Sequence, residues 1–119
     1  MKGKIDLLIG IEWNKDTPYF SNIVEADSRD LHAYVAQVNT SQFGDTRLTQ
    51  PVESARKDIL RLKGGINDAV LVAKINIERL REFQRQKFSL THNKAEYKPL
   101  PPDFSLQDVL SRIENKSVL

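Results

Sequence analysis

Cysteine is absent from the 119 residues of this chain. Its absence excludes disulfide frameworks, thiolate metal sites and cysteine nucleophiles, and it fits a reducing compartment. Long apolar runs are also missing, since the longest, from Ala69 to Ala73, has five residues. A membrane-spanning helix needs roughly 18 such residues. Asp6 and Glu12 interrupt the apolar stretch near the N-terminus, so no signal peptide is predicted. We therefore expect a cytoplasmic protein with no membrane partner.

Motifs for covalent or phosphate chemistry are also lacking. The sequence holds no Gly-x-Ser-x-Gly elbow, and Gly64-Gly65 is followed by Ile66 rather than by the Lys-Ser/Thr ending of a phosphate-binding loop. A turn between two helices explains the glycine pair better. We expect no enzymatic activity and no cofactor.

Two weaker constellations also favour ordinary structural roles. Glu25, Asp27, Asp30 and His32 contain the oxygen and imidazole groups that bind divalent ions. Acidic residues at a solvated helix N-terminus are a commoner explanation, because they complement the helix dipole. Glu12 and Lys15 resemble the acid and lysine of metal-dependent nucleases, but such lone pairs arise often by chance. No metal site is predicted.

The charge of the chain is segregated by segment. Residues 1–46 carry a net charge of −3, residues 47–98 a net charge of +6, and residues 99–119 a net charge of −1. The total of +2 hides this division. A basic middle between two acidic ends indicates either a surface for an acidic partner or ends that fold back on the middle.

The first predicted element is a strand over residues 4–13. Apolar and polar residues alternate along it, which is the pattern of a strand with one buried face. Its apolar face consists of Ile5, Leu7, Ile9, Ile11 and Trp13. Residues 14–18 have turn chemistry, and a second strand over residues 19–26 is expected to return as a hairpin.

Helices are predicted after this hairpin. Asp27 or Ser28 caps a short helix over residues 28–38, and residues 39–50 form a loop. Pro51 suits the first turn of a helix over residues 51–63, which Gly64-Gly65 ends.

Two periodicities compete in residues 67–88. Leu71, Ala73, Ile75 and Ile77 alternate like a strand, whereas Ile66, Ala69, Val70, Ala73, Ile77, Leu80 and Phe83 follow one helical face. The absence of Gly and Pro favours a long helix, which would pair with the preceding one as a helical hairpin. We expect Ile59, Leu62, Ile77 and Leu80 to cover the apolar face of the first strand.

The C-terminal part differs in composition from the rest. Residues 89–103 contain Pro99, Pro101 and Pro102 and predict an extended tether. Ser105 then opens an amphipathic helix. Its apolar stripe consists of Leu106, Val109, Leu110 and Ile113. The sequence therefore predicts an α+β domain over residues 1–98, followed over residues 99–119 by a Pro-rich linker and an amphipathic docking helix.

Two functions follow from these features. A tethered amphipathic helix can dock in the groove of a neighbour or fold back over its own domain. The first option predicts a non-catalytic small subunit or adaptor, with other protein subunits or further copies of the chain as partners. The alternative is a nucleic-acid-binding accessory protein that uses basic helices within residues 47–88. Its contact residues would be Arg47, Arg56, Lys57, Arg61, Lys63, Arg85 and Lys87.

Overall fold

The fold is a mixed sheet with one helix packed against a face and a second helix at one end. The structure, a computed structural model, describes residues 5–65 and 68–85 and the single positions Gln107, Ser111 and Glu114. In order, the elements are β1 (Leu7–Glu12), α1 (Thr17–Leu31), β2 (Tyr34–Asn39), β3 (Thr46–Thr49), the 3-10 turn η1 (Ser54–Arg56), β4 (Asp58–Leu62) and α2 (Ile77–Arg85). This architecture confirms the mixed α and β class.

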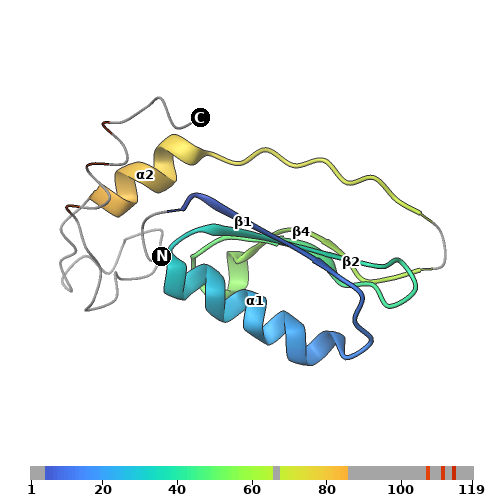
Figure 1. Ribbon diagram of the computed structural model, residues 1–119. Coiled ribbons are helices and arrows are strands. Elements are labelled where there is room, and N and C mark those ends of the chain that lie inside the picture. Colours follow the sequence, from blue (N-terminus) through green and yellow to red (C-terminus); the bar gives the residue numbers. More distant parts are fainter. Residues whose placement is uncertain (1–4, 66–67, 86–106, 108–110, 112–113, 115–119) are drawn as a thin grey trace.

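The sheet has the order β1-β2-β3-β4 (Figure 1). β1 pairs with β2 in parallel, and α1 makes the crossover between them. The β2–β3 and β3–β4 pairs are antiparallel. Within the described residues, β1 and β4 are therefore the edge strands, and α1 lies against one face of the sheet.

Local sequence explains why α1 occupies residues 17–31. Pro18 stands in the first turn, where its missing N–H costs no hydrogen bond. Ser21, Val24 and Ser28 are buried at helical spacing along one side. The helix ends at His32, which has a left-handed backbone, and the Ser28 hydroxyl donates to the Ala33 carbonyl over 2.8 Å.

Two predictions for this region are wrong. Residues 19–26 form no strand, and the partner of β1 is β2 rather than a hairpin neighbour. The predicted helix over residues 28–38 is instead the end of α1 and most of β2. The misleading signal was the spacing of Leu31, Tyr34, Val35 and Val38, which suits a helix. The last three belong to β2, where the tyrosine and the two valines are residues that favour strands.

The region from residue 39 to residue 65 also differs from its prediction. The expected loop contains β3, and the expected helix over residues 51–63 is the short turn η1 followed by β4. The helical hairpin is therefore not formed. A tight loop joins β2 to β3, and Gly44 has a φ of 76° in it. A Cβ atom at Gly44 would lie 2.1 Å from the Lys63 carbonyl oxygen, so this position requires glycine.

Each of the two competing periodicities is correct for one half of residues 68–85. Residues 68–76 are extended, as the strand-like alternation indicates, and α2 begins only at Ile77. The Asn76 side-chain oxygen accepts a hydrogen bond from the Arg79 N–H at 2.9 Å, which caps the helix. The prediction of one helix through residues 67–88 is wrong for its first half.

α2 packs against the sheet at one end. Leu80 is fully buried in a cluster with Tyr34 and Val52. The Arg81 guanidinium donates two hydrogen bonds to one oxygen of Asp6, at 2.6 and 3.0 Å. The fully buried Gln84 side chain donates to the His32 carbonyl over 2.6 Å. These contacts hold the helix beside the start of β1 and β2.

Candidate protein-interaction surface

The two faces of the sheet have different environments. The β1–β2 register places Leu7, Ile9 and Ile11 beside Tyr34, Ala36 and Val38 on the face opposite α1. The even-numbered residues of β1 face the helix instead. We call the apolar side chains of Leu7, Ile9, Ile11 and Val38, with Trp13 just beyond β1, the open face.

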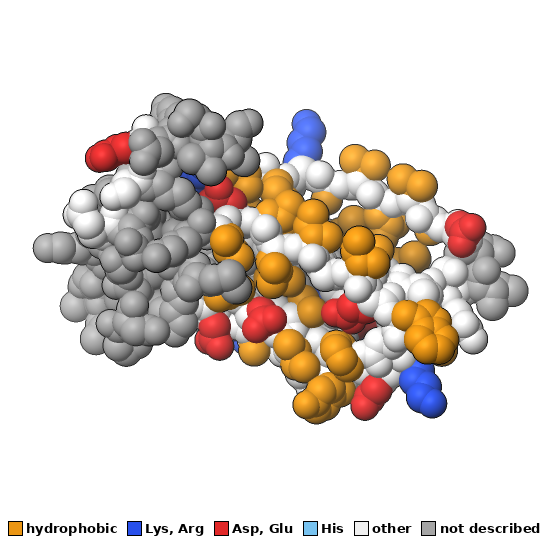
Figure 2. Space-filling view, viewed as in Figure 1, with side chains coloured by type: hydrophobic (Ala, Val, Ile, Leu, Met, Phe, Trp, Pro, Cys, Tyr) orange, Lys and Arg blue, Asp and Glu red, His pale blue; other side chains and the backbone are white. Residues whose placement is uncertain are grey.

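The open face is largely exposed. Ile9 is 59% exposed, Ile11 85% and Trp13 76%, and Leu7 and Val38 are also exposed. Figure 2 shows hydrophobic side chains gathered over the sheet on this side of the molecule. The prediction that helices cover the odd-numbered face of residues 5–13 is therefore wrong within the described chain. Ile59 and Ile77 pack instead around Leu80 at the far end of the sheet.

The extended residues 68–76 pass over this side of the sheet without joining it (Figure 1). No backbone hydrogen bond is formed by residues 68–75 within the described part of the chain. Val70 is 91% exposed and Val72 is 86% exposed, whereas Ile75 is half-buried against the Leu80 cluster. This segment has the backbone and the side-chain alternation of a strand, but it has no ladder.

One end of the extended segment is fixed. The Tyr34 hydroxyl donates to the Asn76 carbonyl over 3.2 Å, and the Asn76 backbone N–H donates to the Tyr34 hydroxyl oxygen over 3.3 Å. After Asn76 the chain continues into α2, which covers only the end of the sheet near Tyr34. Ile9 and Ile11, further along β1, stay uncovered.

The opposite face of the sheet carries polar side chains and is covered by α1. Arg47, only 5% exposed, donates to both carboxylate oxygens of Asp45 at 2.9 and 2.7 Å. Arg61 donates to the same carboxylate at 2.7 Å, and the Ser21 hydroxyl of α1 also hydrogen-bonds it. The Gln37 side chain donates to the Asp45 backbone carbonyl over 2.9 Å. This network joins α1, β2, β3 and β4 around one buried carboxylate.

Glu12 is the last residue of β1, where it pairs in register with Asn39 of β2. Its Oε2 atom is buried and accepts no hydrogen bond from the described residues. Burial raises the pKa of the Glu12 carboxyl from its ordinary value, because desolvation disfavours the charged form. Lys15, its predicted nuclease-like companion, is exposed in the turn before α1.

The basic residues of the nucleic-acid alternative are scattered, and several are neutralised. Arg47 and Arg61 bind Asp45. The Arg56 guanidinium donates to Glu53 over 2.8 Å, and the Lys57 ammonium lies 3.5 Å from Glu25. Lys63 is exposed after β4. The Arg85 side chain and Lys87 lie outside the described residues, so the basic helical stripe is not assembled in the described chain.

The residues considered as metal ligands have ordinary structural roles. Glu25 accepts from Arg29 one turn later at 2.8 Å, and His32 ends α1. No cluster of three metal-ligating side chains exists among the residues that the structure describes. The docking-helix residues Leu106, Val109, Leu110 and Ile113 lie outside the described ranges. No helix within those ranges is long and apolar enough to cross a membrane.

The sequence indicates the apolar side of β1, but it does not show that this side is exposed. The alternation in residues 4–13 identified the apolar side of β1 correctly but not what covers it. A strand shows the same period whether its apolar side meets a helix of its own chain or another molecule. The strand-like alternation from Leu71 to Ile75 pointed to the second feature, the unpaired extended segment.

Comparison with known proteins gives no relative from which to transfer a function: no family model, no curated protein and no solved structure matches this chain.

Proposed function

We propose that this protein is a non-catalytic subunit or adaptor of a cytoplasmic protein assembly, and that it makes contact through the open face. The supporting observation is the exposed apolar row of Ile9, Ile11 and Trp13 beside the unpaired edge of β1. Contiguous apolar surface of this kind is rare on monomers and is typical of protein contacts. An uncovered apolar edge strand is also an aggregation hazard, which a partner would remove.

The predicted docking helix fits this proposal as a second point of contact. Leu106, Val109, Leu110 and Ile113 would enter a groove of a neighbouring subunit. The nucleic-acid alternative has less support, because Arg47, Arg61 and Arg56 already serve carboxylates of the same chain.

The experiment compares complexes purified through a tag on the full chain from the cells that naturally produce it. Ile9→Lys combined with Ile11→Lys places two charges on the open face without touching the buried network. Tyr19→Lys is the matched control, because Tyr19 is a large, mostly apolar side chain of similar exposure to Ile9 but lies on α1.

Light scattering on the purified particles should show wild type and the control in a complex well above the 13.6 kDa of one chain. The double variant should lose this complex and elute as folded protein at a much lower mass. Equal masses for wild type and double variant would refute the role of the open face.

A further inference from the structure

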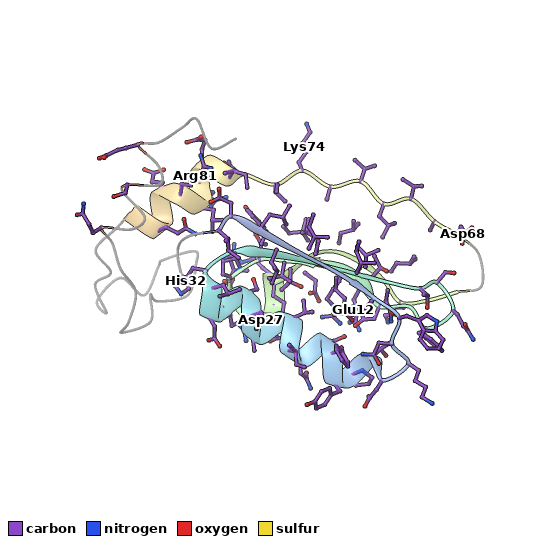
Figure 3. All side chains as sticks on the ribbon, in the orientation of Figure 1. Glu12, Asp27, His32, Asp68, Lys74 and Arg81 are labelled. Atoms are coloured by element: carbon purple, nitrogen blue, oxygen red, sulfur yellow. The ribbon has the colours of Figure 1, made fainter. Side chains whose placement is uncertain are left out.

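The extended residues 68–74 have a self-complementary sequence. Asp68 and Lys74 stand at its two ends, and Val70 and Val72 lie between them. These even-numbered side chains are exposed, while Leu71 and Ile75 lie closer to the sheet. Figure 3 shows Lys74 directed away from the sheet. No salt bridge of Asp68 or Lys74 is present among the described residues.

We propose that residues 68–74 form an antiparallel ladder with the same residues of a second copy of this chain. This contact lies outside the open face, so the proposal goes beyond the proposed function. A two-fold axis through Leu71 places Asp68 opposite Lys74, Ala69 opposite Ala73, and Val70 opposite Val72. Each of these pairs occurs twice, as an isologous interface requires.

Charge complementarity selects this register among the neighbouring ones. Opposite charges that face each other across two strands stabilise the pair, and like charges destabilise it. Moving the axis to Val72 would place Val70 opposite Lys74 and leave Asp68 beyond the paired residues. The axis at Leu71 is therefore the register in which both charged ends find partners and every valine meets a valine.

The backbone of this segment also favours pairing with a second copy of the chain. The N–H and C=O groups of residues 68–75 have no ladder partner in the described chain, and a second extended segment would supply one. The stretch from Ala69 to Ala73 contains no Gly or Pro that would oppose pairing. Six steps of a strand span about 20 Å, enough for a ladder of ordinary length.

The first test is charge reversal in the full chain. Asp68→Lys alone and Lys74→Asp alone each place like charges opposite one another, so each should raise the dimer dissociation constant about tenfold or more. The double variant with both changes restores opposite charges and should return to near the wild-type value. Sedimentation equilibrium measures these constants, and both sites are exposed, so the variants should keep the wild-type circular dichroism.

The second test uses the absence of natural cysteine. Leu71→Cys places the two thiols opposite each other on the proposed axis, whereas Val72→Cys, the matched control, places them two positions apart. Under mild oxidation the first variant should form a disulfide-linked dimer much faster than the second. Faster cross-linking of Val72→Cys would overturn the register.

The outcomes separate this inference from the proposed function. A wild-type chain that stays monomeric at about 100 μM, or a dimer insensitive to both single charge reversals, would overturn self-pairing. The open-face variant Ile9→Lys/Ile11→Lys would still report on a different partner. If the purified wild-type chain is monomeric but binds a different protein, and the Ile9→Lys/Ile11→Lys variant loses that protein, the proposed function stands and only self-pairing is overturned.

Discussion

Asp45 is the residue on which the polar face of the sheet depends. It has a left-handed backbone with a φ of 61°, is nearly fully buried, and accepts hydrogen bonds from two arginines and a serine. A buried carboxylate surrounded by donors is stable only with those donors in place. Without this carboxylate, the buried Arg47 would keep only its 3.4 Å contact with Asp58.

Asp45→Asn should therefore lower the free energy of unfolding by up to about 3–5 kcal/mol, because the buried Arg47 would keep only its longer, 3.4 Å contact with the Asp58 carboxylate. Asparagine also tolerates the left-handed backbone, so this change isolates the charge. Glu53→Gln is the control, since its pair with Arg56 is solvent-exposed. Urea unfolding of both variants measures the difference, and equal losses would contradict the role of Asp45.

Glu12 makes a prediction about pH. Its pKa in the folded state is raised by desolvation, so the folded chain binds a proton more tightly than the unfolded one. The stability associated with Glu12 is fully present below the ordinary pKa of 4.5 and is lost as pH rises through the folded pKa. Glu12→Gln should abolish this loss and be more stable than wild type at pH 7. Denaturation curves from pH 4 to pH 8 should show the two proteins converging at the acidic end.

At the scale of elements, α2 does not cover β1 as the sequence predicts. Leu80 was expected to cover β1, yet it is buried with Tyr34 and Val52 at the end of the sheet, and β1 stays open. The helix begins only at Ile77, so residues 68–76, which were expected to be its first half, are extended and do not cover β1 as a helix. Hydrophobic periodicity alone cannot tell which apolar faces meet.

Leu80→Ala should cost about 2–5 kcal/mol in unfolding free energy, because it leaves a cavity among fully buried side chains. Ile9→Ala, which would cost as much in a covered strand, should change stability by less than about 1 kcal/mol because Ile9 is 59% exposed. Thermal and urea unfolding at low protein concentration compare the two. A larger loss for Ile9→Ala would mean that the open face is covered in the isolated chain.

The elements also show which predictions succeed from sequence. The period of two in residues 4–13 gave β1, and the turn residues before Pro18 gave its end. The helix over residues 51–63 failed because Val52, Ala55, Ile59 and Leu62 have helical spacing, while β4 is fixed by its long-range pairing with β3. A short strand whose identity depends on a distant partner has too weak a local signal to be recognised.

At the scale of the whole molecule, the two faces of the sheet differ in composition. One face packs charged and polar groups against α1, and the other presents apolar side chains and an unpaired strand. A chain that buries its charges and exposes part of its apolar surface gains stability when another molecule covers that surface. A partner that covers this surface would therefore make the folded chain more stable than it is alone.

The melting temperature of the wild-type chain should consequently rise with protein concentration, because association stabilises only the folded form. The charge-reversal variant Asp68→Lys should show a flatter dependence over the same range. Calorimetry from about 5 to 500 μM measures both curves. A melting temperature independent of concentration in the wild type would exclude self-association as a source of stability.

Trp13 gives the chain an optical probe of its own surface. It is the only tryptophan, it is 76% exposed, and it meets the ring of Phe43 edge-on at a centroid distance of 5.8 Å. An indole in water emits at longer wavelength than one enclosed in an apolar contact. Intrinsic fluorescence and its quenching by iodide will thus register the moment at which another molecule covers this end of β1, without any label.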